Sequence, residues 1–307
     1  MRTAMIALAS IALVPFAASG QRQRAEPSFR SATSELVVLP VTVTDEDGAL
    51  VADLPRERFA VFDDGRPQPI AFSTGQDQPV VVGLIVDSSG SVGPKLGEIV
   101  AGALAFARAS NPDDEVFVLE FNDTVTDALP GREISAEHLG ELERTLTALR
   151  PEGRTALYDA LLAGLDRMAP GAGSRRVLVL ISDGGDNAST GTLRQVMRLA
   201  RASDVTIYTI GLFGPDDPDA NPGVLEEIAK ATGGRRFLPK SAGRLLADCR
   251  RIAHEIRAGY TLGYVPPDRD GRFHRVRVAV SDEEGRRLTV RTRPGYVAAA
   301  PPVSTAK

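Results

Sequence analysis

Hydrophobic residues in the middle of the chain follow two alternating patterns. Short, nearly uninterrupted apolar runs such as Val80–Val86 are typical of strands that are covered on both faces of a sheet. Between these runs, apolar residues recur at helical spacing, as they do over residues 96–107. Residues 79–258 contain about six such strands and six such helices. The alternation predicts an α/β domain with a doubly wound, mainly parallel sheet and helices on both faces.

The two flanks of this region show the two-residue period of β-strands instead. Residues 28–78 contain the strand-like run "ELVVLPVTVT" and a hairpin in "RFAVFDDGRPQPIAFST". Residues 259–297 contain "FHRVRVAV" and further arginines, which we interpret as one solvated face of a sheet, with an anion-binding surface as the alternative. Each flank has too few strands to be stable alone, so we expect both to pair in one composite β-sandwich. Residues 298–307 are expected to form a loose tail.

The first twenty residues have the pattern of a secretory signal peptide. Arg2 precedes an apolar stretch from Met5 to Phe16, and the small residues Ala18 and Gly20 suit signal peptidase. The stretch is short for a bilayer span, although an uncleaved anchor is the alternative. We expect a mature protein that begins near Gln21 and is secreted or periplasmic. We expect no stable membrane insertion after the signal is removed.

Composition narrows the classes of function. The net charge of the 307 residues is only -4, and no block of lysines or arginines indicates binding to nucleic acid. Cys249 is the only cysteine, so an intrachain disulfide is impossible. It falls on an apolar helical stripe with Leu245, Ile252 and Ile256. We therefore expect a buried structural thiol and not a nucleophile.

Polar side chains gather at three loops of the predicted α/β domain. Asp87, Ser89 and Ser91 follow the first buried strand, Thr155 precedes a helix, and Asp183 follows "RRVLVLIS". Ligands of such sheets collect beyond the carboxyl ends of the strands, where the strand order reverses. Taken singly, Ser91 and Thr155 could be helix N-caps and Asp183 a turn residue. Together they form an oxygen-only set that suits a hard cation such as Mg²⁺ or Mn²⁺.

The order of these residues resembles a known family. "DSSGS" follows a buried strand as D-x-S-x-S, "GRTALYDAL" supplies a threonine, and "ISDGGDN" supplies an aspartate. The pattern is similar to that of the von Willebrand factor type A domain and its metal-ion-dependent adhesion site. The resemblance implies a doubly wound fold in which Asp87, Ser89, Ser91, Thr155 and Asp183 surround one Mg²⁺ or Mn²⁺. In the family the hydroxyls tend to bind the ion directly, and an aspartate can act through water.

The sequence gives weaker support for roles of other residues near these five. Ser88 and Asp186 are candidates for an outer shell, Asp123 is expected at the surface, and the carboxylate of Asp87 is expected at the exposed end of its strand. Over residues 30–298 the chain resembles a bacterial family of secreted proteins related to the type A domain. That wider resemblance implies the order of the segments more than a function.

The leading functional hypothesis is a secreted, non-enzymatic binding module, in which the cation coordinates an acidic residue of a protein partner. The loop Gly214 to Gly223 lies on the expected rim of the site and could help to select that partner, although an ordinary acidic surface loop is the favoured interpretation. A metal-dependent hydrolase is one alternative. We expect His138, His254 and His274 to lie away from the site, and "GSVG" is not a nucleophile elbow.

A subunit of an ATP-driven chelatase or chaperone is a further alternative, which the predicted export signal disfavours. Two strings, "DEDGAL" and "DRDGRF", begin like calcium loops but lack the full EF-hand pattern. We interpret both as Asp-Gly turns between strands.

Overall fold

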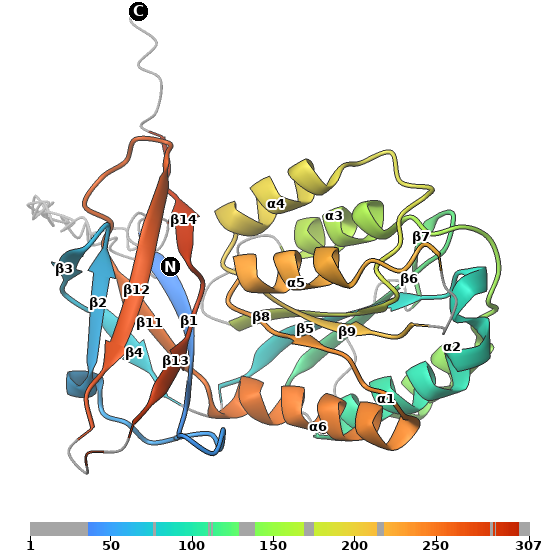
Figure 1. Cartoon of the computed structure of the whole chain (residues 1–307), viewed down its shortest axis with the longest axis horizontal. Coiled ribbons are helices and arrows are strands. Elements are labelled where there is room, and N and C mark those ends of the chain that lie inside the picture. The colour runs from blue at the N-terminus through green and yellow to red at the C-terminus, as the bar shows by residue number, and fades with distance from the viewer. Residues whose placement is uncertain are drawn as a thin grey trace, which may run out of the picture. The chain divides into compact units, whose positions relative to one another are not determined.

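The computed structural model places most of the chain (Figure 1). It describes residues 36–300, apart from 76–77, 110, 112, 129–138, 169–174, 214–217, 283–284 and 286. The predicted signal peptide, His138, the first four residues of the loop Gly214 to Gly223 and most of the tail lie outside the described residues. Within the described part, no helix has both the length and the apolar character needed to cross a membrane.

A six-stranded sheet forms the centre of the α/β domain. In spatial order its strands are β10 (Arg236–Phe237), β9 (Thr206–Gly211), β8 (Arg175–Ser182), β5 (Val80–Asp87), β6 (Glu115–Phe121) and β7 (Val125–Asp127). All neighbours pair in parallel except β6 and β7. The apolar run that predicted a central strand is β5, and its Leu84, Ile85 and Val86 are fully buried. The mainly parallel sheet is confirmed, whereas the three-residue β7 was not predicted.

Helices cover both faces of this sheet (Figure 1). One face packs against α1 (Leu96–Ala109), α2 (Leu139–Ala148) and α6 (Ala242–Ala258). The other packs against α3 (Leu157–Arg167), α4 (Leu193–Ala202) and α5 (Pro222–Ala231). Helix α4 begins with a capping box formed by Thr192 and Gln195, and Asn221 caps α5. On α6, Cys249 is buried in the core, as its apolar stripe predicted.

The flanking segments build two antiparallel sheets that share one core. The first sheet contains β13 (Thr289–Arg291), β1 (Val37–Thr44), β11 (Tyr260–Tyr264) and β4 (Phe72–Thr74). The second contains β14 (Gly295–Val297), β12 (Phe273–Val280), β2 (Phe59–Asp63) and β3 (Arg66–Gln68), with a short 3-10 helix, η3 (Arg56–Arg58), before β2. Strands of the N-terminal flank pair with strands of the C-terminal flank in both sheets. The expected composite β-sandwich is therefore present.

The arginines of the C-terminal flank do not all lie on a solvated face. Arg275 and Arg277 are exposed on β12, as their alternation with valine predicted. Arg293 is only 4% exposed, and its guanidinium donates hydrogen bonds to the carbonyls of Arg201 (2.5 Å) and Ser203 (2.6 Å) at the C-terminal end of helix α4. Burial lowers the pKa of Arg293 to about 10. The interpretation of a wholly solvated arginine face is wrong at this position.

Candidate metal centre

The predicted site lies where the strand order of the parallel sheet reverses. From β5 the chain continues to β6 on one side, while β8 pairs with β5 on the other. Asp87 is the last residue of β5, and Asp183 follows β8 directly. Because β5 and β8 run parallel in register, their carboxyl ends bring these two carboxylates to the same edge of the sheet.

Hydrogen bonds connect four of the five predicted site residues. The Ser89 hydroxyl donates to Asp87 Oδ1 at 2.5 Å, and the Ser91 hydroxyl donates to Asp183 Oδ2 at 2.6 Å. The two serine oxygens are 3.2 Å apart. A residue that was not predicted, Ser182, donates to Asp87 Oδ2 at 2.6 Å. The two carboxylates are thus linked through a short chain of hydroxyl groups.

Neither hydroxyl that could have been a helix cap has that role. Ser91 lies inside η4 (Gly90–Lys95), a 3-10 helix whose first flanking residue is Ser89, and no side chain caps it. Thr155 precedes Ala156, the residue that flanks the start of α3, and the first N–H groups of that helix donate to Asp186 and Ser189 and not to Thr155. The positions of both hydroxyls are therefore better explained by the site than by helix termination.

Hydrogen bonds of its backbone connect Thr155 to the loop that follows β8. Its N–H donates to Asn187 Oδ1 at 2.9 Å, and its carbonyl accepts from the N–H groups of Asn187 and Ala188. Asn187 belongs to the loop that carries Asp183. Among the described residues the Thr155 hydroxyl makes no hydrogen bond to the other four site residues. Thr155 is 5% exposed, so its place beside the site is fixed by the surrounding loops.

Asp123 holds the loop that carries Thr155. It is exposed, as expected, but it accepts hydrogen bonds from the backbone N–H of Arg154 (3.0 Å) and from its guanidinium (2.9 Å). These bonds lower the pKa of the Asp123 carboxyl. Gly153, with a φ of +76°, lets the loop approach so closely that a Cβ there would lie 2.0 Å from Asp123 Oδ2. The positioning role of Asp123 was missed in the sequence.

The two outer-shell candidates have structural roles around the site. The Ser88 hydroxyl donates to Glu120 Oε1 at 2.9 Å, and the Ser88 carbonyl accepts from the N–H of Glu152, which joins two site loops. Asp186 accepts from the N–H of Tyr158 and from the hydroxyl of Ser189. Both residues therefore order the loops, and Asp186 does so at the start of α3.

Burial dominates the electrostatics of the site. Asp87 is fully buried and Asp183 is 1% exposed, which corrects the expectation that Asp87 reaches the surface. Burial raises the pKa of Asp87 to about 6, although hydrogen bonds from Ser182 and Ser89 act in the opposite direction. Within the described residues neither carboxylate forms a salt bridge. Two buried acids without a basic partner, surrounded by hydroxyl groups, fit a hard divalent cation that would supply the missing positive charge.

Two of the three histidines can be placed, and both lie outside this site. His254 is exposed on α6, and His274 is buried in β12 of the sandwich. This agrees with the expectation for both residues. His138 is not among the described residues.

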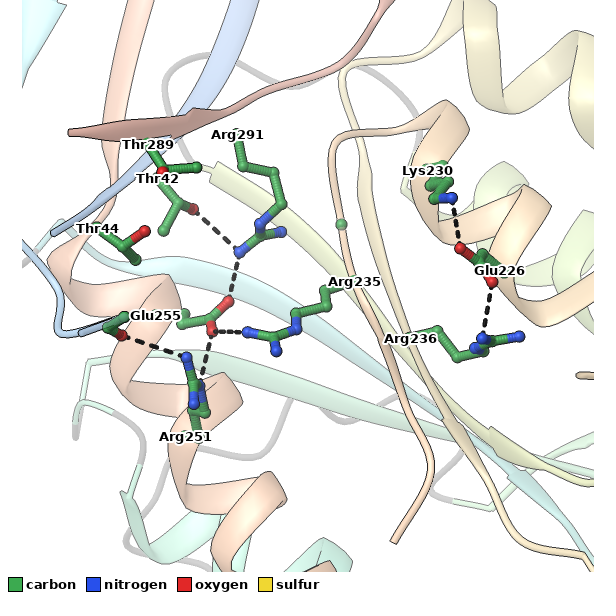
Figure 2. Close-up of a pocket in the computed structure, with 12 residues that line it drawn as sticks. Thr42, Thr44, Glu226, Lys230, Arg235, Arg236, Arg251, Glu255, Thr289 and Arg291 are labelled. Carbon is green, nitrogen blue, oxygen red and sulfur yellow. Dashed lines mark hydrogen bonds and ion pairs between the residues drawn. The ribbon is translucent and has the colours of Figure 1, made fainter. Parts of the chain in front are cut away.

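A second concave region lies beside β13, α5 and α6 (Figure 2). Its charged side chains form ion pairs with one another. Glu255, 1% exposed, forms ion pairs with Arg235, Arg251 and Arg291. Glu226 pairs there with a lysine and a further arginine. Arg291 on β13 therefore contacts the α/β domain and is not part of a solvated face.

A doubly wound sheet with acidic and hydroxyl side chains at its topological switch point defines a class of α/β domains. The family model of the von Willebrand factor type A domain matches residues 82–248, more than half of the chain. The chain therefore belongs to the von Willebrand factor type A family. A search of the curated proteins finds no match.

Solved structures share this fold at low sequence identity. A von Willebrand factor type A protein from Catenulispora acidiphila is 16% identical, with a TM-score of 0.52 over 85% of this chain and 74% of its own. The pilus adhesin SpaC from Lactobacillus rhamnosus GG is 12% identical, with a TM-score of 0.50 over 73% of this chain and 45% of its own. The conserved hypothetical protein BatB from Bacteroides thetaiotaomicron is 19% identical, with a TM-score of 0.47 over 57% of this chain and 98% of its own. At such identities the likeness is one of fold.

Proposed function

We propose that this protein is a metal-dependent binding module whose cation coordinates a carboxylate of a protein partner. The observation that carries the proposal is the pair of buried acids, Asp87 and Asp183, linked by the hydroxyls of Ser89 and Ser91 without a basic partner among the described residues. A buried carboxylate in that state is costly unless a cation compensates it. A divalent ion supplies this charge and a coordination position for an acidic ligand.

The hydroxyl groups and the carboxylates of the site have different roles in this proposal. The hydroxyls of Ser89, Ser91 and Thr155 are neutral oxygen donors, so ligation by them leaves positive charge on the ion for an incoming carboxylate. Asp87 and Asp183 supply the negative charge, directly or through water. Mg²⁺ dehydrates reluctantly and usually retains several waters, so a partner carboxylate that replaces one water is chemically reasonable. Mn²⁺ accepts the same oxygen donors.

The fold supports a preorganised site. β5 and β8 are buried strands, and the loops that follow them are tied to each other through the Thr155 loop. Gly90 N–H donates to the carbonyl of Gly153, and Glu152 N–H donates to that of Ser88. A site on rigid elements loses little entropy when it binds. This favours tight, directional recognition of one carboxylate within a larger protein interface.

We propose binding and not catalysis, because the described acids and hydroxyls of the site are the candidate ligands and His254 and His274 lie elsewhere. We also propose that the protein acts in a secreted or periplasmic compartment, following its predicted signal. Intact-mass measurement of exported protein should show a chain that begins near Gln21, and retention of Met1 would contradict export with cleavage.

A pull-down with the mature protein, with and without chelator, tests the binding proposal. A partner should be captured in Mg²⁺ and released by chelator, and the variant Asp87→Asn should capture none in either condition. Asp166→Asn, which changes an exposed acid on α3, is the matched control and should behave as wild type. Capture by wild type that is unaffected by chelator would contradict the proposal.

A further inference from the structure

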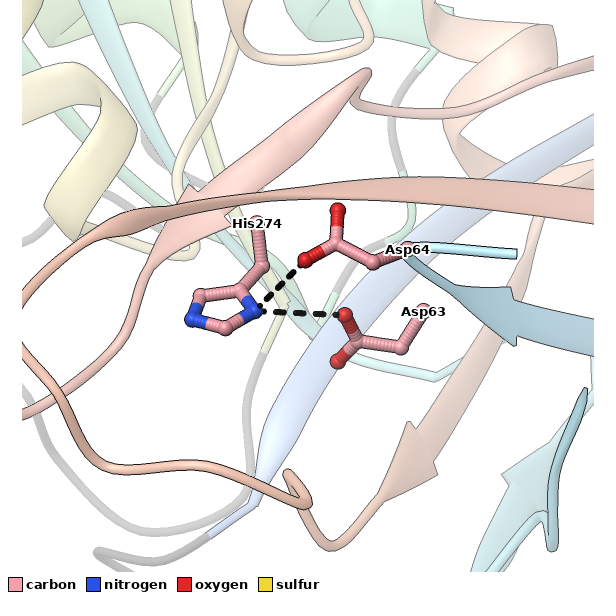
Figure 3. A group of neighbouring side chains, drawn as sticks. All are labelled: Asp63, Asp64 and His274. Atoms are coloured by element: carbon pink, nitrogen blue, oxygen red, sulfur yellow. Dashed lines mark ion pairs between the residues drawn. The ribbon is translucent and has the colours of Figure 1, made fainter. Parts of the chain in front are cut away.

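A second group of ligand-type side chains lies in the β-sandwich, outside the α/β domain (Figure 3). Asp63 ends β2, Asp64 follows in the turn to β3, and His274 lies on β12. One oxygen of each acid and the Nδ1 atom of the imidazole lie within 4.8 Å of one another. Nδ1 is 3.0 Å from Asp64 Oδ2 and 3.6 Å from Asp63 Oδ1.

One carboxylate oxygen of Asp63 is buried without a hydrogen-bond partner. The Asp63 side chain is fully buried, and its Oδ2 accepts hydrogen bonds from the hydroxyls of Tyr264 and Tyr296, both at 2.8 Å. Its Oδ1 has no hydrogen-bond partner. A buried polar atom without a partner costs about 1–3 kcal/mol, and more when it is charged. This oxygen points toward Nδ1 of His274, so a ligand between them would satisfy it (Figure 3).

The other two ligand atoms are oriented by hydrogen bonds on their far sides. Nε2 of His274 lies 3.0 Å from Asp270 Oδ1. When Nε2–H donates to that carboxylate, Nδ1 presents its lone pair to Asp63 and Asp64. Metal-binding histidines generally donate their second ring N–H to a carboxylate or carbonyl in this way. Asp64 Oδ1 accepts from the backbone N–H of Arg275 at 2.9 Å, which leaves Oδ2 facing the imidazole.

We propose that Asp63, Asp64 and His274 form a second metal site, which binds Zn²⁺ or a related divalent transition-metal ion. A nitrogen with two carboxylates suits Zn²⁺ better than Mg²⁺, which prefers oxygen alone. Zn²⁺ holds such ligands at about 2.0–2.2 Å, so two ligand atoms on one tetrahedral ion are about 3.3–3.6 Å apart. The separations of 3.0 and 3.6 Å are close to that range.

The surroundings also leave room for access and for a fourth ligand. The side chain of Asp64 is 50% exposed, whereas those of Asp63 and His274 are buried. An ion can therefore arrive from the side of Asp64, and water can complete a four-coordinate shell there. Binding would join the β2–β3 turn to β12, so the expected role is to stabilise the sandwich.

Calorimetric titration with ZnCl₂ tests this proposal. The protein is mature, untagged and stripped with chelator, and excess Mg²⁺ is present to fill the oxygen-only site of the α/β domain. Wild type should bind one equivalent of Zn²⁺, and His274→Gln should bind at least about 100-fold more weakly because it loses the nitrogen ligand. Asp270→Asn should weaken binding about 10-fold, since that residue only orients the imidazole. Circular dichroism verifies that each variant is folded.

Two matched control variants test whether the loss of Zn²⁺ binding is specific to the proposed ligands. His254→Gln changes an exposed histidine on α6, and Asp268→Asn changes an exposed acid in the loop that carries Asp270. Both should bind Zn²⁺ as wild type does. The absence of saturable Zn²⁺ binding by wild type, or equal binding by wild type and His274→Gln, would overturn the proposal. Neither result would affect the carboxylate-binding proposal, because Zn²⁺ is titrated with Mg²⁺ already present.

Discussion

Removal of the charge on Glu255 should destabilise the protein measurably. The substitution Glu255→Gln keeps the size and shape of a side chain that is 1% exposed on α6. It leaves Arg235, Arg251 and Arg291 without their shared anion (Figure 2). Arg291 comes from β13 of the sandwich, so the perturbation acts where that strand contacts the α/β domain.

The magnitude follows from how exposed each arginine is. Arg235 and Arg251 are 46% and 36% exposed, so each ion pair contributes about 0–1 kcal/mol. Arg291 is 26% exposed, and a charged hydrogen bond of that kind contributes about 1.5–3 kcal/mol. The sum is about 1.5–5 kcal/mol, a range that includes the cost of about 3–5 kcal/mol for removing one partner of a buried pair. We predict a loss of about 2–3 kcal/mol, because the amide can still accept one hydrogen bond.

Urea unfolding followed by circular dichroism measures this loss directly. Glu227→Gln, an exposed position on α5, is the matched control and should stay within about 0.5 kcal/mol of wild type. A double-mutant cycle with Arg291→Gln should give a coupling energy of at least about 1 kcal/mol. If Glu255→Gln unfolds within about 0.5 kcal/mol of wild type, the electrostatic reasoning for this contact is refuted.

Three further predictions follow from local geometry. Burial raises the pKa of Cys249 to about 12, so only about one thiol in ten thousand is ionised at pH 8, and a thiol reagent should label the protein only after urea unfolds it. Gly184→Ala should cost at least about 1–2 kcal/mol in urea unfolding, because φ is +82° and a Cβ would meet the Asn221 carbonyl oxygen at 2.5 Å. Gly97→Ala, in open space on α1, should instead be neutral or stabilising by up to about 1 kcal/mol. Asp123→Asn should weaken Mg²⁺ binding about 10-fold in calorimetry, because it loosens the Thr155 loop, and unchanged affinity would contradict that role.

The sequence predicts those features that a local pattern determines. The apolar run of β5 and the helical spacing of α1 and α6 predicted a buried sheet covered by helices, and the two-residue period predicted the sandwich strands. The order of the site residues along the chain indicated their placement at one sheet edge, because parallel strands bring their carboxyl ends together. Each of these inferences was possible without knowing which distant segments of the chain contact one another.

Most of the features that sequence reasoning missed depend on such contacts. Ser182 looks like an ordinary strand residue until the register of β5 and β8 sets its hydroxyl against Asp87. β7 is too short to show a period. The role of Arg291 follows from the contact of its strand with α6, which periodicity does not encode. Likewise, Asp63 and His274 meet only because β2 pairs with β12.

Calorimetric titration of Mn²⁺ or Mg²⁺ into chelator-stripped mature protein tests the central claim most directly. The titration uses a His274→Gln background, so that the proposed sandwich site does not contribute heat. Asp183→Asn is compared with the parent protein, and Asp166→Asn is the control. The account predicts one bound ion in the parent and in the control, and loss of that ion in Asp183→Asn with the fold retained. Equal binding by the parent and Asp183→Asn would contradict it.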